Sequence, residues 1–117
     1  MGHGDLLCDP QNTPMENPPL SLLEPWCEFV PGQADAFLRE IQVELSPGHP
    51  LYGEKLTALA HSGRADDALF QLDDGRVADV HLTLSGRPEQ PPCPKHRIYA
   101  SLAEWVQRVM IPAHEDR

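Results

Sequence analysis

The residues best suited to chemistry alternate along one short segment of the chain. Asp79, His81 and Thr83 are each separated by one residue, and His61 ends an earlier run of alternating apolar and polar residues. Alternate residues of a β-strand project from the same face of a sheet. The first three side chains therefore share a face, and His61 could join them there. Two imidazoles and a carboxylate in this arrangement could bind a metal ion or exchange protons as an acid–base pair.

A solvated sheet face is the simpler interpretation of the same residues, because antiparallel sheets commonly expose one face to water. His81 would then be a cross-strand partner in a polar ladder. The sequence contains no HxxxH or CxxC spacing, no nucleophile elbow, no phosphate loop and no dinucleotide fingerprint. We therefore predict no metal and no cofactor, and we assign no catalytic residue. The candidate functional face comprises His61, Asp79, His81 and Thr83.

A β-hairpin is the element that has to position this face. Residues 73–75, Asp-Asp-Gly, separate two apolar runs, and a three-residue loop with Gly75 in the left-handed conformation places Phe70 opposite Ala78. A two-residue loop would instead place Phe70 opposite Asp79 and mix apolar and charged residues on both faces, which a buried face resists. We therefore predict the three-residue loop. It assigns to the core face Ala68, Phe70, Ala78, Val80, Leu82 and Leu84, and to the opposite face Leu69, Gln71, Val77, Asp79, His81 and Thr83.

Two helices are predicted from the spacing of apolar residues around this hairpin. The first spans residues 33–45. The second begins at a capping box formed by Ser101 and Glu104 and closes at Pro112. Its apolar stripe has to lie on an apolar surface, and the core face of the hairpin is the expected one. A further alternating run at residues 51–61 predicts a strand ahead of the hairpin.

The predicted fold class is therefore α+β. A three-stranded antiparallel β-meander is packed by two helices, in the order α-β-β-β-α, with both helices on one face of the sheet. Prolines forbid regular structure near the N-terminus, where we expect a disordered or loosely attached leader. The predicted organisation is a leader at residues 1–19, a single domain at 20–112 and a C-terminal tail at 113–117.

Two segments leave alternatives open. Residues 20–30 predict a helical turn or an edge strand whose Trp26 and Phe29 cover the core, or else a linear docking segment for a partner. We favour the core, because exposing both aromatic residues would reduce solubility. Residues 86–95 contain four prolines and predict a stiff connector from the sheet to the second helix, or else a ligand for a proline-binding domain.

Charge and composition limit the classes of partner. The 117 residues include 18 acidic and 9 basic side chains, for a formal net charge of −9. Such a chain repels nucleic acid and anionic membranes, and its basic cluster at residues 95–97 is too short to change that. No apolar run reaches the roughly 20 residues of a membrane helix, no secretory signal is evident, and three cysteines without a framework spacing indicate reduced thiols. We predict a cytoplasmic protein without nucleic-acid or membrane partners.

Three segments resemble a family of small bacterial proteins. The sequences HPLYG at 49–53, DDALFQLDDGRVADVHLTLSG at 66–86 and IYASLAEWV at 98–106 match the pattern HPL…DDxLFxLxDGxxAxVHLTxxG…EW. The resemblance covers about residues 49–110 and is specific as a fold signature. It implies no activity and brings no catalytic residues, and the relatives often carry Trp where Leu84 stands.

Small size, acidity and the lack of catalytic motifs favour a non-enzymatic protein-interaction module, with a basic protein partner bound at the open sheet face. An immunity-type inhibitor of a toxin is one example of such a module. The alternative is a metal-dependent or acid–base enzyme that uses Asp79 and His81 together with His61. A regulatory domain of a larger assembly is a third possibility. The sequence leaves the oligomeric state open.

Overall fold

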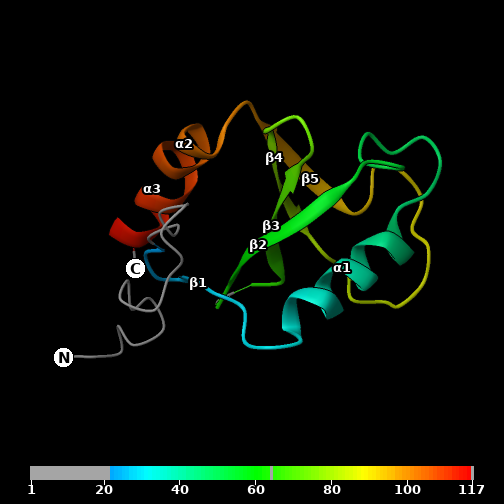
Figure 1. Ribbon diagram of the computed structural model, residues 1–117, viewed down its shortest axis with the longest axis horizontal. Coiled ribbons are helices and arrows are strands. Elements are labelled where there is room, and N and C mark those ends of the chain that lie inside the picture. Colours follow the sequence, from blue (N-terminus) through cyan, green and yellow to red (C-terminus); the bar gives the residue numbers. More distant parts are fainter. Residues whose placement is uncertain (1–21, 64, 117) are drawn as a thin grey trace.

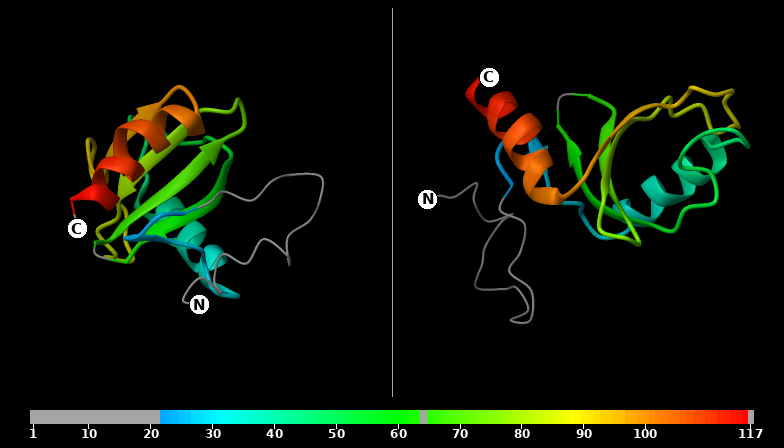
Figure 2. Two further views of the ribbon diagram at one scale, coloured as in Figure 1. Left: turned by 90° about the vertical axis from the view of Figure 1, so that its left-hand side faces the viewer. Right: turned by 90° about the horizontal axis from the view of Figure 1, so that it is seen from above.

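The structure, a computed structural model, describes residues 22–63 and 65–116 and places one antiparallel sheet between helices on its two sides (Figures 1 and 2). Each strand pairs with its neighbour in sequence, in the order β1-β2-β3-β4-β5. The α+β class and the antiparallel meander are thus confirmed. The elements are β1 (Trp26–Cys27), α1 (Gln33–Glu44), β2 (Leu56–Ser62), β3 (Asp67–Leu72), β4 (Val77–His81), β5 (Lys95–Tyr99), α2 (Leu102–Trp105), the π-helical segment η3 (Val106–Met110) and α3 (Ile111–Glu115).

The sheet has five strands rather than the three predicted, and both additional strands lie at its edges. β1 contains only two residues, too few for a periodic pattern, and it confirms the edge-strand alternative for the segment at Trp26. β5 reads Lys-His-Arg-Ile-Tyr and lacks the apolar alternation of a half-buried strand. Basic side chains are typical of edge strands, where they discourage pairing with another chain. A strand with this charged composition lacks the alternation that predicts strands, so the sequence did not indicate β5.

The register of the β3–β4 hairpin agrees with the predicted three-residue loop. Phe70 pairs with Ala78, and the amide of Leu72 donates to the carbonyl of Arg76 at 2.8 Å. Gly75 has a φ of 97°, in the left-handed region that glycine adopts without steric cost. The division of the hairpin into two faces is therefore confirmed from β3 to the end of β4.

The helices lie on opposite faces of the sheet, which corrects the prediction that both share one face (Figure 2). α1 packs Ile41 against the face of Phe70, whereas the C-terminal helix packs Trp105 against the face of Leu69. The second face needs cover because its inner positions are apolar too. The α1 side buries Ile41, Leu45, Leu51, Leu56, Ala68, Phe70, Leu72, Ala78, Val80 and Leu82, and the other side buries Trp26, Ala60, Leu69, Val77, Trp105 and Met110.

The start of the C-terminal helix agrees with the predicted capping box. Ser101 Oγ accepts the amide of Glu104 at 3.1 Å. The Glu104 carboxylate reaches back and accepts the amide of Ala100 at 2.7 Å. The amide of Glu104 in the first turn, which has no helical partner, and the amide of Ala100 just before the cap are satisfied in this way. The cap fixes where the helix begins and so positions Trp105 over the sheet.

The same helix continues past Pro112, where the sequence predicted that it closes. Proline lacks an N–H and clashes with the carbonyl four residues earlier in an α-helix. Here the preceding turn is π-helical, and the amide of Ile111 donates to the carbonyl of Val106, five residues back. We infer that this wider turn accommodates the proline ring. The predicted C-terminal tail is consequently helical as far as Glu115.

The predicted leader at residues 1–19 lies outside the described residues, and so does the predicted start of the domain at residue 20. The predicted connector at residues 86–95 is described and links β4 to β5 without a helix or a strand of its own before Lys95. Within the two described ranges, no helix combines the length and the hydrophobicity needed to cross a membrane.

Candidate functional site

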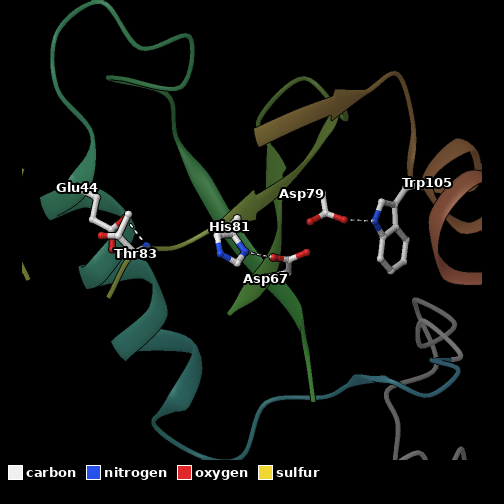
Figure 3. Close-up of polar contacts among 6 residues, drawn as sticks. All are labelled: Glu44, Asp67, Asp79, His81, Thr83 and Trp105. Atoms are coloured by element: carbon white, nitrogen blue, oxygen red, sulfur yellow. Dashed lines mark hydrogen bonds and ion pairs between the residues drawn. The ribbon is translucent and has the colours of Figure 1, made fainter. Parts of the chain in front are cut away.

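Asp79 is a partly buried acid on the candidate face. Its Oδ2 accepts a hydrogen bond of 3.0 Å from the indole Nε1–H of Trp105, which α2 holds over the sheet (Figure 3). Burial raises the pKa of Asp79 to about 6, and the indole bond, the next influence, lowers it. The charge of Asp67 raises this pKa further, whereas His81 and Arg97 lower it. A carboxyl group with such a pKa can hold or release a proton near neutral pH.

His81 lies two residues further along β4 and is bound to Asp67, its cross-strand neighbour in β3. The imidazole Nδ1–H donates to Oδ1 of Asp67 at 2.6 Å. Because a carboxylate can only accept, Nδ1 carries the hydrogen of this bond. The His81 side chain is 55% exposed. The pair is therefore accessible to a ligand from solvent.

β5 completes an open pocket above these residues. Lys95, Arg97 and Tyr99 alternate along the strand, and the register places Arg97 opposite Asp79 and Lys95 opposite His81. Their side chains consequently share the candidate face. The pocket has a volume of about 320 Å³ and is lined by Asp67, Asp79, His81, Lys95, His96, Arg97, Tyr99 and Val109.

His61 lies on the other face of the sheet and does not join Asp79. A β-bulge at residues 58–60 shifts the pairing of β2 with β3, so that His61 pairs with Ala68 on the α1 side. The extra residue of a bulge reverses the face of every residue that follows it. The imidazole stacks with the ring of Phe29, at a centroid distance of 5.1 Å.

Thr83 lies beyond the end of β4 and is also separated from Asp79. Its backbone amide donates to the carboxyl group of Glu44 at 3.0 Å, and its hydroxyl donates to the Glu89 carboxylate at 2.9 Å. Figure 3 shows Thr83 beside Glu44, away from the indole of the C-terminal helix. Of the four candidate residues, the structure brings together only Asp79 and His81.

A group of acids that the sequence analysis did not single out surrounds the turn after β4. Glu44 is fully buried, and its carboxyl group accepts the amides of Thr83 at 3.0 Å and Leu84 at 2.9 Å. Glu40, one helical turn earlier, accepts the amide of Gly86 at 2.9 Å and shares a hydrogen bond with Glu44. Burial, followed by this bond to Glu40, raises the pKa of Glu44 to about 7. Near neutral pH Glu44 therefore occurs in both protonation states, and its protonated form can donate to the Glu40 carboxylate.

These acids hold Leu84 in a conformation that is rare for its residue type. Its φ is 60°, in the left-handed region, and 51% of its surface is exposed. The prediction that Leu84 lies on the core face is wrong, because β4 ends at His81 and the chain then turns away from the sheet. One pattern could have revealed Glu44: it stands three residues after Ile41, within the apolar stripe of α1.

His49, the first residue of the HPL segment, is buried and both of its ring nitrogens are engaged. Nδ1 accepts the amide of Leu51 at 3.0 Å, and Nε2 lies 2.9 Å from the carbonyl oxygen of Pro94. The first bond requires a bare Nδ1, so Nε2 carries the hydrogen and donates it to Pro94. The imidazole thus joins the loop after α1 to the loop before β5.

In the described part of the chain, no three His, Cys, Asp or Glu side chains come close enough together to hold a metal ion. Comparison of the chain with protein-family models, with curated proteins and with solved structures finds no match. The resemblance to small bacterial proteins over residues 49–110 therefore stays a prediction. Function has to be argued from the residues themselves.

Proposed function

We propose that the chain is a small non-enzymatic protein-interaction module that binds a basic protein partner through the surface around Leu84. The exposed, left-handed Leu84 is the observation that carries this proposal. A leucine in this conformation costs about 1–2 kcal/mol relative to a helical one. Because its side chain is exposed, burial of apolar surface does not offset this cost. Backbone strain of this kind clusters at functional sites.

The turn is held rigidly enough to present Leu84 to a partner. The carboxyl group of Glu44 binds two successive amides of the turn, and that of Glu40 binds a third, at Gly86. Ser85 Oγ donates to Glu89 at 2.7 Å from the other side of the turn. An apolar contact that is ordered before binding loses little conformational entropy when the partner arrives.

Charges around Leu84 favour a basic partner. Glu40 and Glu89 are partly exposed at the turn, with Arg87 as their basic neighbour. Val43 is 41% exposed and lies three residues from Glu40, so the two are neighbours on the surface of α1, and Val43 offers a second exposed apolar side chain. The formal net charge of −9 would also accelerate encounter with a basic surface.

The surface around Leu84 replaces the sheet face that the sequence nominated for a basic partner. The C-terminal helix packs on the inner part of that face, at Leu69 and Val77. The pocket that stays open includes Lys95 and Arg97, which repel a basic protein. Among the residues that the structure describes, an exposed leucine and acids lie together at this turn.

Site-specific photo-cross-linking in the native host tests this proposal. A photoreactive amino acid at position 84 should capture one protein with a basic surface, and Leu84→Asp should abolish complex formation with that protein when both are purified. Val30 is the matched control, because it is 56% exposed and precedes the opposite end of α1. Equal capture from positions 84 and 30, or undiminished binding of the Leu84→Asp variant, would contradict the proposal.

An acid–base enzyme is the second candidate, and it rests on Asp79 with its pKa of about 6 in an open pocket beside His81. Carboxyl groups with raised pKa values in pockets are typical of general acids and bases. A strain without the gene separates the two candidates. If the chain is an enzyme, the Leu84→Asp variant should restore this strain and the Asp79→Asn variant should not. If it is an interaction module, Asp79→Asn should restore the strain and Leu84→Asp should not.

A further inference from the structure

The pocket over β4 and β5 contains two cations, Lys95 and Arg97, that lie near its acids without a direct ion pair to them. Its two acids are already engaged: Asp67 binds His81 at 2.6 Å, and Asp79 binds the indole of the C-terminal helix at 3.0 Å. Within the described residues, neither Lys95 nor Arg97 forms an ion pair with a carboxylate. In a chain of net charge −9, two such cations at one pocket are a feature that solubility does not require.

The strand geometry sets the spacing of these cations. Lys95 and Arg97 are alternate residues of β5, so they project from the same face about 7 Å apart along the strand. Both are exposed, which leaves their donors available to a ligand. Tyr99, the next residue on that face, is partly buried and also lines the pocket. The guanidinium offers a planar fork, and the ammonium a point charge, for oxygens placed between them.

We propose that this pocket binds a small organic dianion, a phosphate monoester or a dicarboxylate, between Arg97 and Lys95, with Asp79 protonated in the complex. Val109 of the C-terminal helix supplies an apolar wall for the organic part of the ligand. The volume of about 320 Å³ suits a molecule of this class rather than a macromolecule. This inference is independent of the interaction at Leu84 and of any catalysis, because it concerns equilibrium binding alone.

Uptake of a proton follows from the groups that face Asp79. These are Trp105 from α2, Asp67 from β3, His81 from β4, and Arg97 and Tyr99 from β5. A bound dianion adds negative charge beside a carboxyl group whose pKa is already about 6, and it therefore favours the protonated form further. Asp79 then changes from a group that repels the ligand to a hydrogen-bond donor. Affinity for the dianionic form of the ligand, corrected for the ligand's own second ionisation near pH 6, should consequently rise as the pH falls through about 6.

Titrations of the full chain followed by NMR test the proposal, with inorganic phosphate, phenyl phosphate and succinate as probes. A saturable shift of the Arg97 side-chain Nε–H is expected. Arg97→Gln should weaken binding by about tenfold or more, since it removes a charge-assisted pair, and Arg97→Lys should restore part of the loss. Preference for phenyl phosphate or for succinate distinguishes the two kinds of dianion.

Arg39→Gln and Lys55→Gln are matched controls, because both remove an exposed cation outside the pocket. They change the net charge as much as the pocket variants do, and they should leave affinity unchanged within about twofold. Isothermal titration with succinate at about pH 7, where its carboxyl groups are ionised, in buffers of different ionisation enthalpy should show the uptake of a proton, and Asp79→Asn should abolish it. Lack of saturation with all three probes, or equal losses in the pocket and control variants, would overturn the proposal.

Discussion

The carboxyl group of Glu44 accepts the backbone amide of Leu84 at 2.9 Å from a fully buried position in α1. This bond joins residues 40 positions apart in sequence and fixes the turn that follows β4. A second amide, that of Thr83, donates to the same carboxyl group at 3.0 Å. Glu44→Ala should cost at least about 1–3 kcal/mol of unfolding free energy, because it leaves buried amides without an acceptor. Urea denaturation measures this loss.

Glu44 should also make stability depend on pH near neutrality. Its pKa is raised to about 7 in the folded chain from an ordinary value of 4.5, so its contribution is complete below 4.5 and is lost as the pH rises through about 7. Glu44→Gln keeps the acceptor and cannot ionise. Urea unfolding between about pH 5 and about pH 8 should therefore show a smaller decline for Glu44→Gln than for the wild type.

The matched control for this pH dependence is Glu54→Gln, which removes one exposed negative charge outside the turn. It should retain the decline of the wild type. The neighbouring acid Glu40 acts in the opposite direction, because its pKa is lowered, first by its bond to Glu44, and its contribution is lost on acidification instead. If the curves of Glu44→Gln and the wild type ran parallel from about pH 5 to about pH 8, the assignment of a raised pKa to Glu44 would be wrong.

Leu84→Gly should not destabilise the chain, although it deletes a large side chain. The φ of 60° is strained for leucine but not for glycine. The substitution therefore relieves about 1–2 kcal/mol of strain in the folded state. The greater backbone entropy of glycine in the unfolded state offsets about 0.5–1 kcal/mol of this gain. Leu84→Val should be less stable than the wild type, because a β-branched residue tolerates this conformation poorly. Thermal unfolding of the two variants checks the order, and a marked loss in Leu84→Gly would show that the leucine side chain packs in the fold.

The hairpin was predictable because its information is local. The loop at residues 73–75 and the alternation around Phe70 lie within a few residues of each other, and turn chemistry together with burial determines one register. The start of the C-terminal helix was predictable for the same reason, since Ser101 and Glu104 satisfy neighbouring amides. Both elements agree with the expectations drawn from the sequence.

The side of the sheet on which each helix packs depends on contacts between distant residues. Leu69 and Val77 stood on the face assigned to water, and their apolar side chains were the available indication that this face is covered as well. The bulge that moves His61 away from Asp79 is a single extra residue in β2, which alternation cannot reveal. The place of Glu44 in the apolar stripe of α1 indicates burial, but the amides it binds lie 39 and 40 residues away in sequence, so its role could not be predicted.

Trp105→Phe should raise the pKa of Asp79 above its value of about 6. The indole Nε1–H donates to the carboxylate at 3.0 Å and lowers this pKa, so its removal leaves burial less opposed. Carboxyl carbon shifts recorded during a pH titration measure the change. Trp26→Phe is the matched control. Trp26 packs edge-on against Trp105 at a centroid distance of 4.9 Å. Its replacement removes the same volume but keeps the indole N–H of Trp105. An unchanged Asp79 pKa in Trp105→Phe would contradict the role of the indole.

His49 should make the chain sensitive to acid. Its Nδ1 accepts the amide of Leu51, so protonation of the ring breaks a buried bond, and burial lowers the pKa of His49 below the ordinary 6.5. A lowered folded-state pKa means that the stability supplied by the neutral ring is complete above 6.5 and is lost as the pH falls toward and through the folded value. His49→Gln should be less stable at neutral pH and should lose less on acidification.

The tautomer of His49 gives a direct test of the same bond. Long-range proton–nitrogen correlation spectra should show a bare Nδ1 and a protonated Nε2, because Nε2 donates to the carbonyl of Pro94. His96→Gln is the control: the His96 ring lies 4.4 Å from that of His49 and lowers its pKa less than burial does. That variant should preserve the tautomer and most of the acid sensitivity. A protonated Nδ1 at neutral pH would show that the link between the two loops is not formed as described.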